Sequence, residues 1–242
     1  MMLKQTAIVL ALVATPTLLS ASETNGDLAP KGDAGPIVDS SWDAFRHAHP
    51  GTDRTMHFGR TTRVYGQAFS FGASAKASAD EFVAEHAELW GLDPEQLLPI
   101  GPFADGAHVI PVMTDPITGA PKFQLVAYTP HVDGVPVYDA AMRLLVRNNP
   151  GFPLVLASVQ IPDVAGFSIP GGMNAAALND AAYTRGAREW FQPGAALSGV
   201  RAVVFAGADG NSQAPRPAVE FILTGGDQGD GGQGHEHLPP VH

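Results

Sequence analysis

The hydrophobic period changes at Ala107, and this change restricts the possible folds more strongly than any other pattern in the chain. Before it, the best-defined apolar pattern has helical spacing; after it, apolar residues lie in extended runs separated by turn residues. Because such turns join neighbouring strands, the runs form an antiparallel meander, whose apolar face needs a covering layer. The sequence therefore predicts an α+β fold, with strands at 107–113, 121–129, 134–147 and 154–161.

A helix that precedes the meander can supply this layer. In residues 79–90, apolar side chains recur every three or four positions on one face. Ser78 and Glu81 form the expected capping box at its start, and Gly91 is the expected C-cap. His86 lies on the apolar face, where we expect a hydrogen-bonded core histidine.

Further elements are expected on both sides of this unit. A short helix starts at Ser40 and ends before Pro50, and a strand interrupted by Gly66 follows. After residue 169 a helix and two strands are expected again, so the chain has two consecutive parts, 38–169 and 170–224. The expected additional segments are the strand 56–71, the helix 175–190, and the strands 200–206 and 217–224.

The first 22 residues are typical of a secretory signal peptide. Lys4 precedes an apolar run, and the small residues Ser20-Ala21-Ser22 favour cleavage after Ser22. An uncleaved membrane anchor is the alternative, but the run is shorter than the ~20 residues that span a bilayer. We therefore expect a secreted or periplasmic protein without stable membrane insertion after cleavage. Residues 23–37 are expected to be a flexible leader, and the Gly/Asp/His-rich residues 225–242 a disordered tail or linker.

Charge and cysteine content exclude several classes of protein. Removal of Lys4, one of 14 basic residues, leaves 13 against 24 acidic residues. A nucleic-acid partner is not expected, because phosphate binding needs a basic face. The chain has no cysteine, which excludes a lipoprotein anchor, thiol catalysis and cysteine zinc sites.

The end of the chain, GHEHLPPVH at 234–242, begins like a zinc-protease motif. His235 and Glu236 match its opening, but the second histidine is replaced by Pro239, and Pro239-Pro240 prevents the required helix. We expect a solvated linker in which His235, His237 and His242 bind metal only adventitiously. No cofactor is expected, because phosphate-binding loops and nucleophile elbows are also missing from the sequence.

Two other groups of polar residues could carry catalysis. His47, His49 and His57 could converge on a metal, and a hydrolase is the function that this would imply. The acidic residues of the helix at 79–90 occupy its solvent side, as charged residues usually do; they are Asp80, Glu81, Glu85 and Glu88. We therefore expect a protein that is not an enzyme.

The segment 128–138 is the strongest candidate for contact with another protein. Asp133-Gly134 between extended runs predicts a hairpin turn, and Pro136 within a strand is tolerated at an edge or bulge. Such an edge is either protected from pairing or adapted to meet another protein. The candidate contact residues are Tyr128, His131, Asp133, Gly134, Val135, Pro136, Val137 and Tyr138.

Gly-Val-Pro-Val-Tyr at 134–138, the long strand after it and the turn at 148–151 resemble the fungalysin/thermolysin propeptide (FTP) domain of secreted zinc proteases. The Tyr-Gly element at 65–66 and the helix ending in Leu89-Trp90-Gly91-Leu92 are similar to the same family. Residues 170–224 look like the peptidase-propeptide (PepSY-like) unit that commonly follows. The chain departs from the family at Ala127 and at Thr129 or Pro130, where many members have Arg and Gln.

The resemblance implies cystatin-like units and a non-catalytic role. The protein would inhibit a thermolysin- or fungalysin-like metalloprotease, or act as its folding chaperone, in trans or as the front of a precursor. An extracellular or envelope-associated binding or scaffold module without a protease partner is the alternative.

Overall fold

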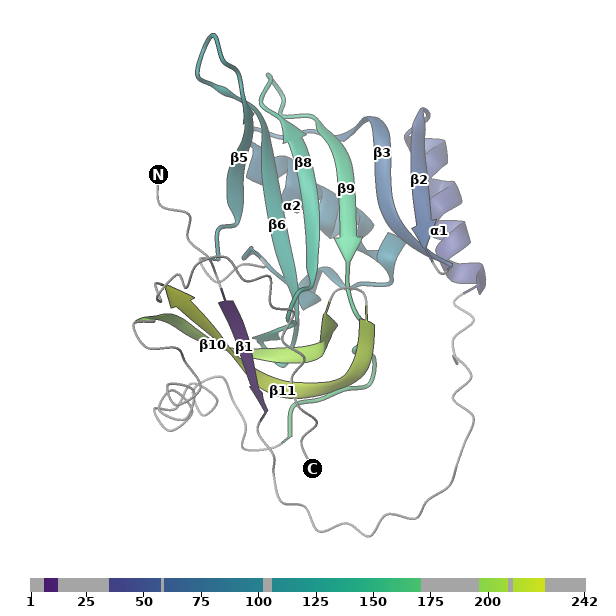
Figure 1. Ribbon diagram of the computed structural model, residues 1–242. Helices are drawn as coiled ribbons and strands as arrows, with labels where there is room; N and C mark the ends of the chain where they lie inside the picture. Colours follow the sequence, from purple (N-terminus) through teal and green to yellow (C-terminus); the bar gives the residue numbers. More distant parts are fainter. Residues whose placement is uncertain are drawn as a thin grey trace.

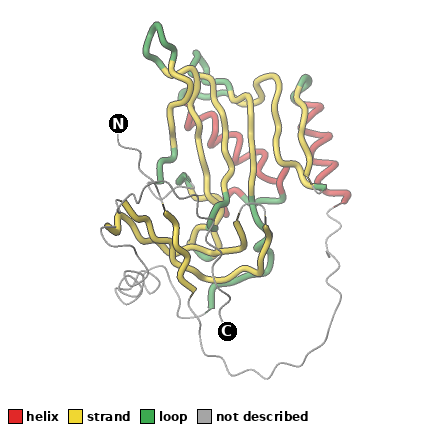
Figure 2. The backbone as a smooth tube through the Cα atoms, in the orientation of Figure 1, coloured by secondary structure: helices red, strands yellow, loops and turns green. Residues whose placement is uncertain are grey.

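The computed structural model describes residues 7–12, 35–57, 59–101, 106–170, 196–208 and 211–224. It shows an α+β protein with a large antiparallel sheet, two α-helices on one face of this sheet, and a smaller sheet at one end of its strands (Figures 1 and 2). The coarse fold class predicted from the sequence is therefore confirmed.

The large sheet is a meander extended by a hairpin on one side. Its strands pair in the order β2-β3-β9-β8-β6-β4, and β5 and β7 also pair with β6. All pairs within it are antiparallel. The strands are β2 (Thr52–His57), β3 (Arg60–Ser70), β4 (Leu97–Leu98), β5 (Val109–Thr114), β6 (Pro121–Val132), β7 (Val135–Pro136), β8 (Ala141–Arg147) and β9 (Leu154–Gln160).

Two α-helices cover one face of this sheet and form the main core with it. They are α1 (Gly35–Ala48) and α2 (Ala75–His86), and short 3₁₀ turns follow at η1 (Ala87–Trp90) and η2 (Pro94–Gln96). Phe82 of α2 is fully buried and has ring contacts with Phe45 at 6.3 Å and Phe69 at 5.2 Å. This aromatic cluster joins both helices to the sheet.

The smaller sheet consists of β1 (Ala7–Leu12), β11 (Asn211–Thr224) and β10 (Ala196–Ala208), in the order β1-β11-β10. It contacts the large sheet through the segment after the β6–β7 turn: Val137 forms a parallel bridge with Val204, and Tyr138 N–H donates to the Val204 carbonyl at 2.8 Å. A second core cluster lies here; its buried members are Val135, Val137, Ala140, Ala202, Val204 and Val219.

The structure corrects the start of the main helix. Ser74, not Ser78, is the N-cap of α2: its hydroxyl accepts from Ala77 N at 3.1 Å. Ser78 is buried inside the helix, and its carbonyl accepts a 2.8 Å hydrogen bond from Ser70 of β3. The local capping pattern was misleading because contact with the sheet places this serine in the core. Gly91, with φ 67°, ends η1 as a left-handed cap, which confirms the predicted end of the helical segment.

Two expected strands are divided in the structure. The strand expected at 56–71 contains the end of β2, a turn at Gly59 with φ 73°, and β3, because β2 and β3 form a hairpin. The strand expected at 134–147 consists of β7 and β8, because the chain turns between them at Asp139, with φ 52°.

In the second part, β10 and β11 confirm the two predicted strands but are longer than expected. The first helix starts at Gly35 and not at Ser40, so residues 35–37 of the expected leader belong to α1. The helix expected at 175–190, residues 23–34 of the leader and the tail lie outside the described residues. Within the described part of the chain, no helix is long and apolar enough to span a bilayer.

Candidate functional site

The face of the large sheet opposite the helices carries a continuous apolar row. Five strands contribute one residue each, and the strand register places each residue directly opposite the next. Their sequence neighbours Val64, Ala157, Leu144 and Val126 are buried on the helix side, so alternation directs the row to the other face. In order across the sheet, the row consists of Tyr65, Leu156, Leu145, Leu125 and Ile110.

This row, which we call the open-face row, is only partly covered. Tyr65 is 38% exposed and the four aliphatic residues are half-buried. None of them belongs to a core cluster among the described residues. The helices lie behind the sheet in Figure 1, and the smaller sheet lies beyond its strand ends. The row thus presents a flat aliphatic surface on a hydrogen-bonded support.

Arginines flank the open-face row. Arg63 and Arg143 lie in the next cross-strand row, each opposite Ser158, and Arg147 is two residues beyond Leu145 on the same face of β8. None of the ion pairs among the described residues involves these three guanidinium groups. Asp53 of β2, opposite Tyr65, is the carboxylate at the edge of this surface. In a chain of formal net charge −10, this face is locally cationic.

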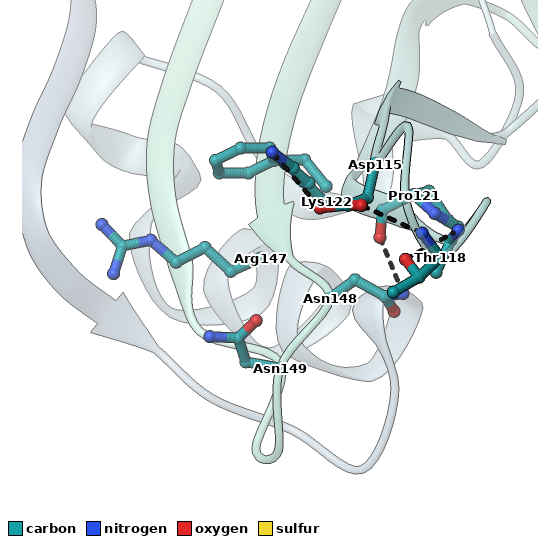
Figure 3. Close-up of a pocket in the computed structure, with 9 residues that line it drawn as sticks. Asp115, Thr118, Pro121, Lys122, Arg147, Asn148 and Asn149 are labelled. Atoms are coloured by element: carbon teal, nitrogen blue, oxygen red, sulfur yellow. Dashed lines mark hydrogen bonds and ion pairs between the residues drawn. The ribbon is translucent and has the colours of Figure 1, made fainter.

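A shallow pocket of about 410 Å³ continues this face beyond Arg147 (Figure 3). Arg147 lies opposite Phe123, which joins the pocket to the sheet. Asp115 accepts from Thr118 N at 3.1 Å and Ile117 N at 2.8 Å, and these hydrogen bonds lower the pKa of its carboxyl group. Lys122 Nζ lies 3.5 Å from Oδ2 of Asp115, so this lysine already forms an ion pair. Arg147 is therefore the group in this pocket suited to bind an added carboxylate.

The pocket wall is held by a second set of polar contacts. Asn148 accepts from Gln124 Nε2 at 2.8 Å and donates to the Pro121 carbonyl at 3.0 Å. These bonds fix the turn after β8, so that Arg147 and Asn149 project from an ordered backbone (Figure 3).

The segment 128–138, predicted to contact a partner, has mainly internal contacts. Asp133 and Gly134 have φ values of 52° and 78°, which confirms the hairpin turn between β6 and β7. Val135 and Val137 are 2% and 1% exposed and pack against the smaller sheet. Tyr128 is also buried at 3%. These three side chains are therefore not available to a partner in this structure, because they contribute to the protein's own cores.

The more exposed members of the segment are fixed from within as well. The carboxylate of Asp133 accepts from Ile169 N at 2.9 Å, and His131 Nδ1 accepts from Gly134 N at 3.0 Å. Pro136 pairs with His131 across the short hairpin, and Tyr138 lies 5.6 Å from Phe205, ring to ring. The segment joins the two sheets.

Tyr128 also connects the end of the sheet to α2. Its hydroxyl donates to Asp80 at 2.7 Å, and Lys76 pairs with the same carboxylate. Burial alone would raise the pKa of Asp80, but the hydrogen bonds from Lys76 and Tyr128 lower it overall. Burial and the Asp80 hydrogen bond raise the pKa of Tyr128, so the phenol remains protonated. Asp80 is thus structural, whereas Glu81, Glu85 and Glu88 are exposed as expected.

The histidines considered for metal binding are not brought together. His47 and His57 are exposed, whereas His49 packs on Phe45 at 4.6 Å and on His86 at 5.6 Å. Burial lowers the pKa values of both His49 and His86, which favours neutral rings in this aromatic cluster. Among the described residues, no group of three or more His, Asp or Glu side chains could hold a metal ion. The tail residues His235, His237 and His242 lie outside those residues.

Comparisons of the chain with protein-family models, with curated proteins and with solved structures find no match. The resemblance to the FTP family therefore stays a prediction drawn from the motifs at 134–138 and in α2.

Proposed function

We propose that this chain is an exported, non-catalytic protein-binding module of propeptide type, with cystatin-like units, and that it acts on a thermolysin- or fungalysin-like metalloprotease. The open-face row supports this proposal: partly exposed apolar side chains lie in register across five strands, next to arginines without ion-pair partners in the described structure. A protein surface with these properties is suited to bind another protein.

The side chains of this face are better suited to bind a partner protein than to stabilise the fold. The aliphatic row supplies apolar area, and Arg63, Arg143 and Arg147 supply charge that can pair with carboxylates of the partner. Because the backbone is already ordered in the sheet, little further ordering is needed on binding. The contact therefore involves the middle of the sheet, while residues 128–138 hold the two sheets together.

Inhibition assays with the chain from Glu23 to His242 and a thermolysin-like enzyme test this proposal. Leu145→Glu places a carboxylate in the centre of the open-face row and is expected to abolish inhibition. Ile117→Glu is the matched control, because this residue is 91% exposed in the β5–β6 turn, away from the row. It is expected to inhibit as well as the parent. Circular dichroism checks that both variants are folded.

Two results would contradict the proposal. If the parent inhibits no thermolysin-like enzyme and binds none in calorimetry, the scaffold alternative without a protease partner is favoured. If folded Leu145→Glu inhibits like the parent, the protease is bound elsewhere on the chain.

A further inference from the structure

The smaller sheet contains a strand that the sequence assigns to the signal peptide. β1 pairs antiparallel with β11, from Ala7 opposite Leu223 to Leu12 opposite Ala218 (Figure 1). Its sequence, Ala-Ile-Val-Leu-Ala-Leu, is part of the apolar run before the expected cleavage at Ser22. The structure thus shows the uncleaved chain with part of its expected signal peptide paired along β11.

Removal of the expected signal peptide would leave β11 as an edge strand. The sheet order is β1-β11-β10, so β11 would keep β10 as its neighbour on one side and lose β1 on the other. The opposite edge, on β10, is partly covered, because Val137 bridges to Val204 and Tyr138 N donates to the Val204 carbonyl at 2.8 Å. An edge with unpaired backbone N–H and C=O groups is a ready template for another strand.

We propose that signal-peptide removal opens the edge of β11 from Ala218 to Leu223, and that this edge binds an extended aliphatic segment of a partner protein as an added antiparallel strand. The occupant is defined by the strand that lies there in the uncleaved chain, which is aliphatic throughout and pairs over six residues. The proposal depends on the expected cleavage and not on the open-face row or on a protease.

A foreign segment fits this chemistry better than a second copy of β11. The paired strand places Leu10 opposite Glu220, a residue that is 3% exposed and whose carboxylate is paired with Arg201 of β10. The β11 strand of a second copy of the chain would bring its own Glu220–Arg201 ion pair to the contact between the two copies. An uncharged strand adds backbone hydrogen bonds without an additional buried charge.

A peptide with the sequence of β1 tests the proposal directly. The probe is Ala-Ile-Val-Leu-Ala-Leu with lysines added at both ends for solubility, and the protein is the chain from Glu23 to His242. Saturable binding is expected, together with slowed amide hydrogen exchange in residues 218–223. Absence of binding, or binding without protection of these amides, would overturn the proposal.

Two methylated peptides distinguish strand addition from nonspecific adhesion. In a strand, alternate N–H groups point to opposite sides, so one set faces β11 and the other faces away. One peptide carries N-methyl groups at the positions of Ile8 and Leu10, the other at those of Val9 and Ala11. We expect one to bind about tenfold or more weakly and the other to resemble the parent. Equal binding by all three peptides would show adhesion without strand pairing.

Two further measurements separate this proposal from the function proposed above. Mass spectrometry of the exported protein shows whether residues 1–22 are absent; their retention would overturn the inference, because β1 would keep the edge closed. Sedimentation of the chain from Glu23 is expected to show a monomer. A dimer whose β11 amides are protected would overturn the choice of a foreign partner. None of these results depends on protease inhibition.

Discussion

Leu144 and Leu145 are adjacent residues of the same type on opposite faces of β8, and their replacement by alanine should have unequal effects. Leu144 is 0% exposed in the core with the helices, whereas Leu145 is half-buried in the open-face row. Leu144→Ala removes a fully buried side chain and leaves a cavity under α2, which costs about 2–5 kcal/mol of unfolding free energy. Leu145→Ala leaves a space open to solvent, so mainly the transfer contribution remains, about 1–2 kcal/mol.

Urea denaturation followed by circular dichroism measures both values in the chain from Glu23 to His242. We expect the midpoint to fall much further for Leu144→Ala, with a similar m value for both variants. The comparison is internally matched, because strand propensity and the deleted atoms are the same. Equal losses for the two variants would refute the assignment of the faces, since they would require something to cover Leu145 as completely as the helices cover Leu144.

The stability of the protein should decrease as the pH falls below about 6.5, because burial lowers the pKa values of His49 and His86 and the unfolded chain then binds more protons. Thermal melts from pH 8 to pH 5 measure this loss, and a flat profile would contradict it. Glu220→Met should cost about 3 kcal/mol, because it removes the buried carboxylate that pairs with Arg201; an unchanged denaturation midpoint would show that the pair is not structural. Gly66→Ala should cost about 3 kcal/mol, because φ is +129° and its Cβ would lie 2.4 Å from a backbone oxygen before β2; a melting temperature equal to the parent's would refute this strain.

The parts of the fold that local chemistry determines could be predicted from the sequence. Asp133-Gly134 gives a hairpin because both residues tolerate positive φ, and Gly91 ends the helical segment for the same reason. The strands β6, β8 and β9 follow from extended apolar runs between turns. These signals lie within a few residues of the structure that they define.

The helix start and the candidate contact segment depended on contacts distant in the sequence. Ser78 and Glu81 match a capping box, but the helix begins at Ala75, three residues before Ser78, because this serine is buried against Ser70 of β3. Val135 and Val137 have the alternation of an edge strand, and this alternation does not show that a second sheet buries them. Local pattern cannot distinguish an edge that meets a partner from one that meets the same chain.

The open-face row was not predicted because it exists only through strand register. Its members lie on five different strands and are far apart in the sequence. Each is also flanked by residues of the opposite face, as Leu145 is flanked by Leu144 and Val146. Alternation within β8 was the available signal, yet the run Met-Arg-Leu-Leu-Val-Arg is apolar on both faces at its centre. Only the pairing across five strands identifies the surface.

Methyl NMR tests the binding role of this surface most directly. Leucine methyl groups of the chain from Glu23 to His242 are labelled and observed while an inactive thermolysin-like protease is added. We predict that the methyl signals of Leu125, Leu145 and Leu156 shift or broaden, whereas those of Leu144, on the helix side, change little. Protease binding that leaves the three open-face leucines unchanged, or the absence of binding, would contradict the account.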